Sequence, residues 1–390
     1  MPRLVKFFLL MSFLYNPVCI LDIDAAVLTA VSCSGTDVQK AVDSATDGDV
    51  VLVPSGNCAW SSPVKISGKG ITVRGAGIDN TVITIGGTSA FEIRGNIDML
   101  VRITGFSFRE GLAIYMHDGN APQFRIDGNR FENCQTRAIW IIKGHFVGVI
   151  DHNTFINTVG EGDIDVMWDS ELAWQRDKSV GTSDFVFIED NTFTYDATES
   201  DPPRHVVTSC YGGRYVFRHN AVSAASAYGG SWRLENPVDA HGYCFYGRGT
   251  VSYEIYKNTF DVQDTVWYMF IRGGNGVIYD NTMEGSNVTG QHIVLTNYRS
   301  RNSCTQCPVD STCCTSYPCQ DQINNLYIWN NSYKGNPATV YVMDENLVRT
   351  HIQMDRDFFL YALPDYKPYT YPHPLIVTIV TPPRNLRIVQ

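Results

Sequence analysis

A phrase of the form apolar-x-x-Asn-Thr-Phe recurs along the chain, and the spacing of its asparagines constrains the fold more than any other feature. The residues three before and two after each asparagine are apolar, with the alternation at period two that is typical of strands with one buried face. The shortest intervals between copies are 23 and 24 residues, which predicts one turn of a solenoid of short strands. The column consists of Asn129, Asn153, Asn191, Asn220, Asn258, Asn281 and Asn331.

The asparagine column favours a structural role over a catalytic one. An Asn in a bend can adopt the left-handed conformation, and identical amides stacked on neighbouring turns can hydrogen-bond to one another as a ladder. A degenerate earlier copy has Phe106 in the Asn position, with Ile103 and Phe108 in the two apolar columns. At one turn per ~23 residues, the repeat region predicts a single solenoid of about ten turns.

The phrases FIEDNTF (187–193), EIYKNTF (254–260) and VIYDNTM (277–283) resemble turns of right-handed parallel β-helix proteins, the pectate-lyase-like or pectin-lyase-fold superfamily. The resemblance implies an all-β fold, a single-stranded right-handed parallel β-helix with an N-terminal capping helix. Apolar residues at i, i+3, i+4 and i+7 within 38–45 are consistent with that capping helix. Because one fold hosts many functions, the resemblance predicts architecture and leaves the activity open.

The chain ends suggest export and a separate tail. Residues 1–26 are interpreted as a secretory signal peptide, because basic residues precede an apolar stretch over 7–21 and small residues follow up to Ala26. That stretch falls short of the ~20 residues needed to span a bilayer. Residues 27–363 are expected to form the β-helix, and the Pro- and Tyr-rich residues 364–390 a C-terminal strap or linker. We therefore expect a secreted, extracellular protein.

The cysteine pattern agrees with an oxidising compartment. Cleavage after Ala26 would remove Cys19 and leave an even number of cysteines, which suits disulfides. Cys33 and Cys58 are a plausible pair. Five cysteines crowd into 304–319, where zinc binding is the alternative to disulfides, and export favours the disulfides. Five is odd, so at least one of them pairs with Cys134, Cys210 or Cys244, or stays free.

Charge and missing motifs exclude several function classes. With 30 Lys+Arg against 40 Asp+Glu the net charge is −10, so no basic field indicates a nucleic-acid partner or an anionic membrane surface. Gly-x-Ser-x-Gly, Walker, His-Glu-x-x-His and Rossmann patterns are absent, which leaves serine hydrolase, NTPase, zincin and dinucleotide-binding functions without support. The Asp-pair and Gly-His signatures of polygalacturonase-like relatives are also missing, which argues against a pectin hydrolase.

Three intervals exceed one turn and hold insertions, after Phe155, Val222 and Met283. Insertions in a solenoid project from its side, so they would wall one cleft if they left the coil at the same corner. Candidate functional residues concentrate in the first two of these insertions.

The first insertion combines carboxylates with tryptophans. Asp163 and Asp165 are two residues apart, so their side chains would face one way on an extended segment. Such a pair could act as acid and base or nucleophile in glycoside hydrolysis, or could bind a Ca²⁺ ion that neutralises a uronate in a lyase; a solvated acidic loop is the alternative. Trp168 and Trp174 are candidate sugar-stacking residues or packing anchors. Beyond this candidate Ca²⁺, the sequence indicates no cofactor.

A second region, from Arg204 to Arg248, and the next turn supply bases and cations. A β-eliminating lyase needs a base, a cation and a proton donor, and His241, beside a glycine and outside the repeat columns, is the leading catalytic candidate. Arg214 and Arg248 are assigned to catalysis as clamps for a substrate carboxylate, with an ion-paired surface role as the alternative. Tyr246 and Arg272 are candidate substrate-binding residues.

Two functional hypotheses follow. The first is a secreted carbohydrate-active enzyme that acts on a polysaccharide or cell-surface glycan along an elongated groove, with a polysaccharide lyase favoured over a glycoside hydrolase. The second is a non-catalytic adhesin, surface fibre or glycan-binding module, so the sequence leaves open whether the protein is an enzyme, and it does not define the oligomeric state. Lyase action on an anionic polyuronate requires a cationic groove. It therefore requires four arginines to cluster: Arg204, Arg214, Arg248 and Arg272.

Overall fold

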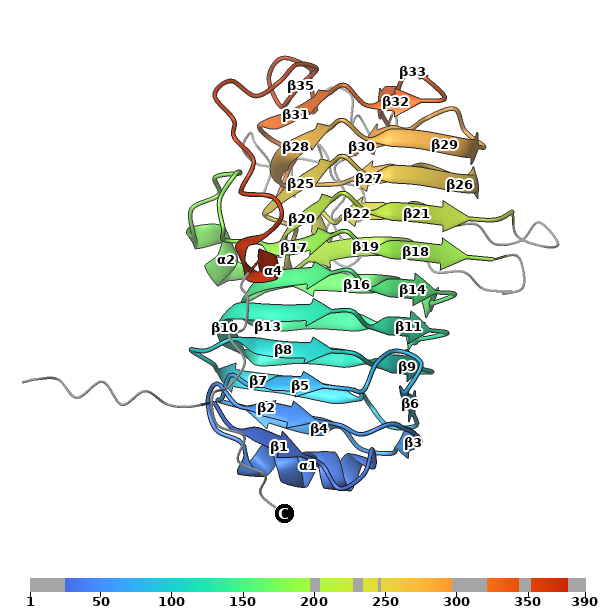
Figure 1. The fold of residues 1–390 in the computed structure, drawn as a ribbon. Coiled ribbons are helices and arrows are strands. Elements are labelled where there is room, and N and C mark those ends of the chain that lie inside the picture. Colours follow the sequence, from blue (N-terminus) through green and yellow to red (C-terminus); the bar gives the residue numbers. More distant parts are fainter. Residues whose placement is uncertain are drawn as a thin grey trace, which may run out of the picture.

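A computed structural model describes residues 25–196, 204–226, 234–244, 247–296, 321–343 and 352–377. The expected signal peptide, the five clustered cysteines and Tyr246 lie outside these residues. The described chain winds into a right-handed parallel β-helix in which each turn contributes strands to three stacks (Figure 1). The fold that the Asn repeat and the resemblance predicted is therefore confirmed.

Stack 1 precedes the asparagine in each turn, and it receives the second halves of the long strands β10 (Ile114–Asp127) and β13 (Ile139–Asp151). β1 (Val27–Thr29) pairs with its first strand. Its other strands are β2 (Val50–Leu52), β5 (Thr72–Arg74), β8 (Val101–Thr104), β17 (Val186–Glu189), β20 (Arg214–Arg218), β25 (Ser252–Tyr256), β28 (Asn275–Tyr279), β31 (Leu326–Trp329) and β35 (Phe358–Phe359).

Stack 2 follows the asparagine, and its strands contribute the Phe of the repeat to the core. Phe131, Phe155 and Phe193 stack with ring centroids 4.5–4.6 Å apart. The strands are β3 (Gly56–Trp60), β6 (Thr81–Ile85), β9 (Ser107–Arg109), β11 (Arg130–Glu132), β14 (Thr154–Ile156), β18 (Thr192–Tyr195), β21 (Ala221–Ala224), β26 (Thr259–Thr265), β29 (Thr282–Asn287) and β32 (Ser332–Tyr333), which β33 (Asn336–Pro337) joins antiparallel.

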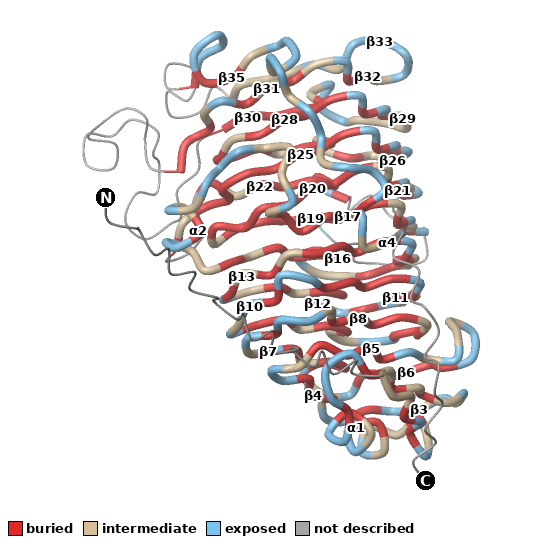
Figure 2. The backbone as a smooth tube through the Cα atoms, turned by 60° about the vertical axis from the view of Figure 1, so that its left-hand side comes forward, coloured by how far each residue is buried: buried red, intermediate tan, exposed pale blue. Residues whose placement is uncertain are grey.

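Stack 3 completes the turn and later provides the candidate site. The first halves of β10 and β13 belong to it. Its other strands are β4 (Val64–Ser67), β7 (Phe91–Asn96), β16 (Gly162–Met167), β19 (His205–Cys210), β22 (Val238–Ala240), β27 (Met269–Ile271), β30 (Ile293–Leu295) and β34 (Val340–Val342). Two short additional pairs are β12 (Gln135–Thr136) with β15 (Val159–Gly160), and β23 (Tyr243–Cys244) with β24 (Gly247–Arg248). Buried residues line the inside of the coil at every level (Figure 2).

The asparagines form the expected ladder at the corner between stacks 1 and 2. Asn191 Oδ1 accepts hydrogen bonds from the backbone N–H and the side-chain amide of Asn153, both at 3.0 Å, and the same pattern repeats along the column. In the degenerate turn, the backbone N–H of Phe106 donates to Asn129 Oδ1 at 3.1 Å, so Phe106 does stand in the Asn position. The ladder provides hydrogen-bond partners for polar groups that are buried away from water at this sharp corner.

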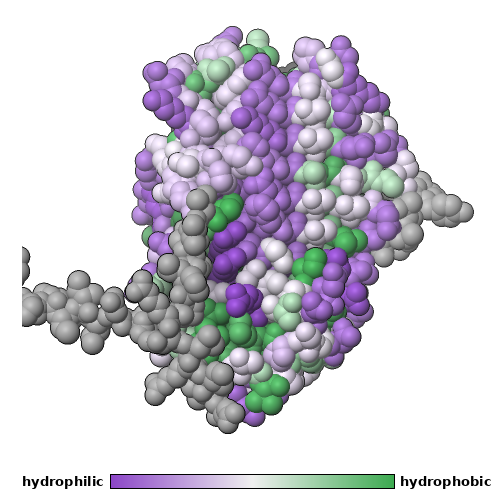
Figure 3. Space-filling view, in the orientation of Figure 1, coloured by the Kyte–Doolittle hydropathy of each residue, from purple (hydrophilic) through white to green (hydrophobic). Residues whose placement is uncertain are grey.

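The left-handed residue at this corner is the one before the Asn, so the expectation that the Asn itself adopts αL is wrong. His152, Asp190, His219, Lys257 and Asp280 have φ between 52° and 56°. The side chain of the residue before the Asn points outward, where any polar side chain fits. The Asn side chain points inward and makes the hydrogen bonds of the ladder. In Figure 3 this corner appears as a hydrophilic band along the coil.

The N-terminal end is capped as predicted. Helix α1 (Gly35–Ser44) buries Val38 and Val42 against the first strands, and the Ser34 side chain accepts from the Asp37 N–H at 3.2 Å as N-cap. Cys33 and Cys58 form a disulfide beside it. Cys210 is also disulfide-bonded, and Cys134 is a buried free thiol.

Parts of all three insertions leave the coil at the corner between stacks 3 and 1 and pack on each other, while another part of the second, between β21 and β22, leaves at the corner between stacks 2 and 3. The first includes helix α2 (Glu171–Gln175), whose Trp174 indole N–H donates to Gly249 O at 3.0 Å in the second. Gly249 N–H in turn donates to Asp321 Oδ2 at 3.1 Å, at the end of the third. The shared corner that would wall one cleft is therefore present.

The C-terminal segment up to helix α4 (Pro374–Val377) crosses the outer face of stack 1 (Figure 1). Arg218, fully buried, donates to Tyr369 O at 2.8 Å and Thr370 O at 2.9 Å, and Arg125 donates to Leu375 O at 3.1 Å. We call residues 363–377 the strap. In the described part of the chain, no helix has the length and apolar character needed to cross a membrane.

Candidate functional site

Parallel pairing aligns one outward-facing column of side chains on stack 3. Trp140 is opposite Asp165, and Asp165 is opposite Thr208. Val207 pairs with Val238, so Thr208 and Asp239 are neighbours on the next pair of strands, and Asp239 is opposite Phe270. Asp165 and Asp239 therefore face the same side of the sheet, two strand spacings apart.

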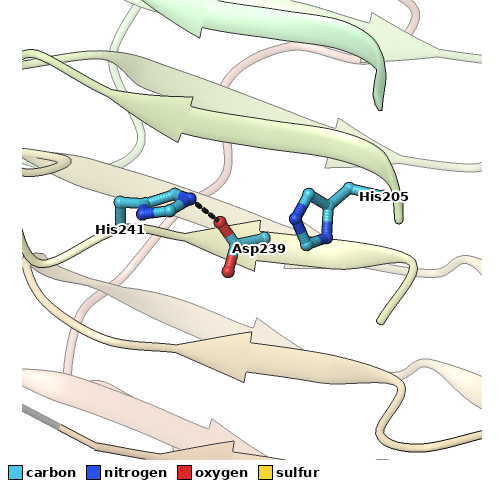
Figure 4. A group of neighbouring side chains, drawn as sticks. All are labelled: His205, Asp239 and His241. Atoms are coloured by element: carbon cyan, nitrogen blue, oxygen red, sulfur yellow. Dashed lines mark ion pairs between the residues drawn. The ribbon is translucent and has the colours of Figure 1, made fainter. Parts of the chain in front are cut away.

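Asp239 lies at the centre of a charged cluster. Its carboxylate accepts from one guanidinium nitrogen of Arg272, 2.7 Å from each oxygen, and from the Thr208 hydroxyl at 2.9 Å. His241 Nε2 lies 2.9 Å from Asp239 Oδ2 and 2.5 Å from the same guanidinium nitrogen (Figure 4). Asp239 is fully buried, whereas a quarter of the His241 side chain is exposed. His241 is therefore the part of this cluster most open to a substrate.

The pKa values in the cluster move apart. Burial opposes ionisation of Asp239, but the Arg272 charge and the neighbouring imidazoles outweigh it and hold the pKa of Asp239 well below its usual range. Burial, reinforced by the Arg272 charge, lowers the pKa of His241. Asp239 is accordingly ionised and His241 neutral at neutral pH.

His205 lies on the other side of Asp239, from the adjacent strand (Figure 4). Among the described residues, one group of three carboxylate or imidazole ligands can be drawn, namely His205, Asp239 and His241. The geometry fits a metal ion poorly, because the Arg272 guanidinium bonds to both oxygens of Asp239 and contacts His241. His205 Nδ1 also lies 3.1 Å from the carbonyl oxygen of Asn236. Arginine already supplies the positive charge that a cation would bring.

Asp165 is the second carboxylate of the column. Its Oδ2 accepts from Arg137 Nε, while its buried Oδ1 has no hydrogen-bond partner among the described residues. Burial raises the pKa of Asp165 to about 6, although the Arg137 charge opposes the shift. Asp165 thus holds a proton in mildly acidic solution where Asp239 does not.

Asp163 and Asp165 are hydrogen-bonded to different partners. Its Oδ2 accepts from the hydroxyl of Tyr195, a core residue of stack 2, whereas Asp165 bonds to Arg137. Burial raises the pKa of Asp163 to about 7. Each carboxylate has one oxygen bonded to a different partner and a buried Oδ1 without a partner among the described residues, so the calcium site that their spacing suggested stays a prediction.

The arginines expected to clamp a substrate carboxylate are engaged in separate places. Arg214, 1% exposed on stack 1, donates to Asp184 at 2.7 Å and to two backbone carbonyls. Arg248 donates to Asp321 at 2.6 Å and to Glu171 at 3.0 Å. With Arg272 on Asp239, each guanidinium has its own carboxylate. Three of the four arginines that lyase action on a polyuronate requires are therefore neutralised by carboxylates, and the fourth, Arg204, is exposed, which counts against a cationic cluster.

The two candidate tryptophans, Trp168 and Trp174, have different surroundings. Trp174 packs under Arg248, whose guanidinium carbon lies 4.3 Å from the ring centroid, so its role is that of a packing anchor. Trp168 is 1% exposed and meets His145 edge-on at 4.7 Å, but it also lines a surface pocket. Tyr246 lies outside the described residues.

Three residues of the site were not selected from the sequence: Asp239, Asp165's partner Arg137, and His205 as a cluster member. The Asp-Ala-His spacing of 239–241 places carboxylate and imidazole on one strand face and could have indicated the pair. Arg137 gives no such signal, because it approaches Asp165 from the preceding turn.

Comparisons with known proteins agree on architecture. No protein-family model matches the sequence, and no curated protein matches it. Three solved structures are similar: an alginate lyase from Paenibacillus sp. (12% identity, TM-score 0.43, covering 82% of this chain and 98% of that one), the catalytic unit of an α-1,3-glucanase from Streptomyces thermodiastaticus (15%, 0.38, 81% and 68%), and a family 28 exopolygalacturonase from Yersinia enterocolitica (11%, 0.30, 83% and 79%). At these identities the likeness concerns the fold alone.

Proposed function

We propose that this protein hydrolyses glycosidic bonds of an uncharged polysaccharide, with Asp165 as general acid and Asp239 as general base. The observation that supports this most is the pair of carboxylates in one outward column, with one pKa raised to about 6 and the other held low. Opposite shifts of this kind assign acid and base roles to two carboxyl groups. Secretion, expected from the sequence, is consistent with the Cys33–Cys58 disulfide and belongs to the same proposal.

The chemistry needs two proton transfers. Protonated Asp165 donates its proton to the glycosidic oxygen as the bond to the anomeric carbon breaks. Ionised Asp239 removes a proton from the water that attacks that carbon, with His241 at the exposed edge positioned to hold the water. Two strand spacings put the backbones of the pair about 9–10 Å apart. We propose an inverting reaction, in which a water molecule fits between carboxyl groups ~6.5–9.5 Å apart, in place of a retaining one at ~5–5.5 Å.

Both carboxylates are covered in the structure, and the covering groups are partly exposed. Arg137, whose side chain is 22% exposed, covers Asp165, and His241 covers Asp239. A substrate must therefore displace the Arg137 guanidinium to reach Asp165. Arg137 is a positioning residue in this mechanism, because it holds Asp165 in place until a substrate takes over its contact.

A polysaccharide lyase with His241 as base is the second candidate. The lowered pKa of His241, caused first by burial, leaves a neutral imidazole at the surface, as proton abstraction requires. The separate engagement of Arg214, Arg248 and Arg272 counts against it. A non-catalytic glycan-binding module is the remaining alternative.

One incubation separates these functions. The protein is mixed with dextran, a soluble β-glucan, an α-1,3-glucan and polygalacturonate, with and without chelator, and products are analysed. New reducing ends from a neutral glucan, without ultraviolet-absorbing unsaturated ends, are expected. Unsaturated ends from polygalacturonate would support the lyase, and binding without cleavage the module.

A further inference from the structure

A pocket of about 650 Å³ opens on the same outward face as Asp165. Trp140, Ile142 and Met167 line it, and Met167 lies two residues beyond Asp165 on β16, so both side chains face the same way. Trp168 and Tyr211 line it from the corner of the insertions. An apolar surface of this size within a polar rim is typical of a pocket for a small ligand group.

Arg137 connects the pocket to the acid. It lines the pocket, donates to Asp165, and places its guanidinium carbon 4.8 Å from the centroid of the Trp140 ring. Any group seated on Trp140 therefore contacts the residue that covers Asp165. The pocket and the proposed general acid are one contiguous site.

Polar atoms at the pocket have no partner in the described chain. These are the indole N–H groups of Trp140 and Trp168 and the Oδ1 of Asp169, all shielded from water. Trp168 itself is 1% exposed. Buried donors and acceptors without partners are costly, and a ligand rich in hydroxyls both accepts and donates hydrogen bonds.

The charges around the pocket balance. Arg137 and Lys143 are opposed by Asp118 and Asp169, and Asp169 is itself paired with Arg176 at 2.7 Å. No surplus of positive charge is available for a uronate carboxylate. The pocket chemistry therefore suits an uncharged sugar.

We propose that this pocket is a subsite for one uncharged sugar residue of the polysaccharide, next to the bond that Asp165 protonates. The sugar's apolar face would lie on Ile142, Met167 and the edge of Trp140, because Tyr115 stacks on the Trp140 ring and the Arg137 guanidinium lies over it, and its hydroxyls would reach the rim. The proposal rests on the proposed function and assigns its substrate class. The bound polysaccharide would then extend from Asp165 toward the preceding turns of stack 3.

The test measures binding separately from cleavage. Ile142→Trp fills the pocket without removing a core residue, Trp140→Ala removes its aromatic surface, and Tyr361→Ala, at a half-exposed tyrosine outside the pocket lining, is the matched control. Thermal melting first confirms that each variant is folded. Isothermal titration with oligosaccharides of the neutral glucan that the wild type binds, and with oligogalacturonate, then gives affinities.

We expect both pocket variants to weaken neutral oligosaccharide binding at least tenfold, Tyr361→Ala to leave it unchanged, and oligogalacturonate to bind no better than background. Unchanged affinity in both folded pocket variants, tighter oligogalacturonate binding, or no binding of any neutral oligosaccharide would overturn the assignment. If binding follows the prediction but no glucan is cleaved, hydrolysis fails while the subsite stands. If cleavage occurs and the pocket variants bind normally, the subsite fails while hydrolysis stands.

Discussion

His241 Nε2 and Asp239 Oδ2 lie 2.9 Å apart, with Asp239 on β22, His241 just beyond its end and Arg272 contacting both. The Arg272 charge helps to keep Asp239 ionised and His241 neutral. In an isolated Asp–His ion pair, by contrast, the imidazole would be protonated. A buried anion between a guanidinium and a hydroxyl is a fixed hydrogen-bond acceptor, and the proposed mechanism uses it to orient the attacking water.

The pH dependence of cleavage should follow Asp165. The general acid must be protonated, so kcat is expected to fall as pH rises through about 6, while Asp239 stays ionised throughout the working range. Initial rates between pH 4 and 8 test this. A rate that rises through pH 6 and stays high at pH 8 would contradict the assignment and would suit a neutral His241 base instead.

Replacing an asparagine inside the ladder should destabilise the coil. Asn191 accepts from Asn153 and donates to Ile150 O at 2.8 Å and Asn220 Oδ1 at 3.1 Å. Asn191→Ala leaves several buried groups without partners, each costing about 1–3 kcal/mol. Thermal melting should show a large drop, and Asn331→Ala, at the end of the ladder, a smaller one. Equal small effects would mean that water replaces the ladder.

Asp163 should make the folded state less stable as pH rises. Its folded pKa of about 7 exceeds the value of 3.8 for an unperturbed Asp, so the folded state holds the proton more tightly. That stability is fully present below pH 3.8 and is lost as pH rises through 7, by up to roughly 4 kcal/mol. Asp163→Asn should flatten the loss, measured by denaturant unfolding at pH 5 and 8. An unchanged pH dependence in the variant would contradict this account.

The strap should be needed for stability of stack 1. Removing residues 364–390 takes away the carbonyls of Tyr369 and Thr370 and leaves the buried Arg218 guanidinium with fewer acceptors. It also uncovers Phe187, whose ring lies 5.2 Å from that of Tyr369. We expect a lower melting temperature and new binding of an apolar dye. Tyr371→Ala, at a strap residue that is 45% exposed, should have a much smaller effect, and a truncation that melts like the full chain would show the strap to be dispensable.

The sequence predicted the coil because its turns repeat: the apolar columns, the Asn ladder and the capping helix all depend on local spacing. It placed αL on the wrong residue, since an Asn tolerates that conformation as well as the His, Asp or Lys before it. His241, selected as the leading catalytic candidate, lies in the charged cluster, and its catalytic role stays a prediction. Asp163, Arg214 and Arg248 are bonded to partners that the sequence did not indicate. Those partners, Tyr195, Asp184 and Asp321, come from other strands and from insertions, whose side-chain contacts the repeat spacing does not specify.

The paired-carboxylate account is tested most directly by measuring reducing ends released from a neutral glucan by the wild type, Asp165→Asn and Asp239→Asn, all shown to be folded. Both substitutions replace a carboxylate by an amide of nearly equal size. General acid–base catalysis contributes about 10²–10⁴-fold. We therefore expect wild-type cleavage with inverted anomeric configuration and at least 100-fold slower release in each variant. Wild-type rates in either folded variant, or unsaturated ends as the main product, would contradict the account.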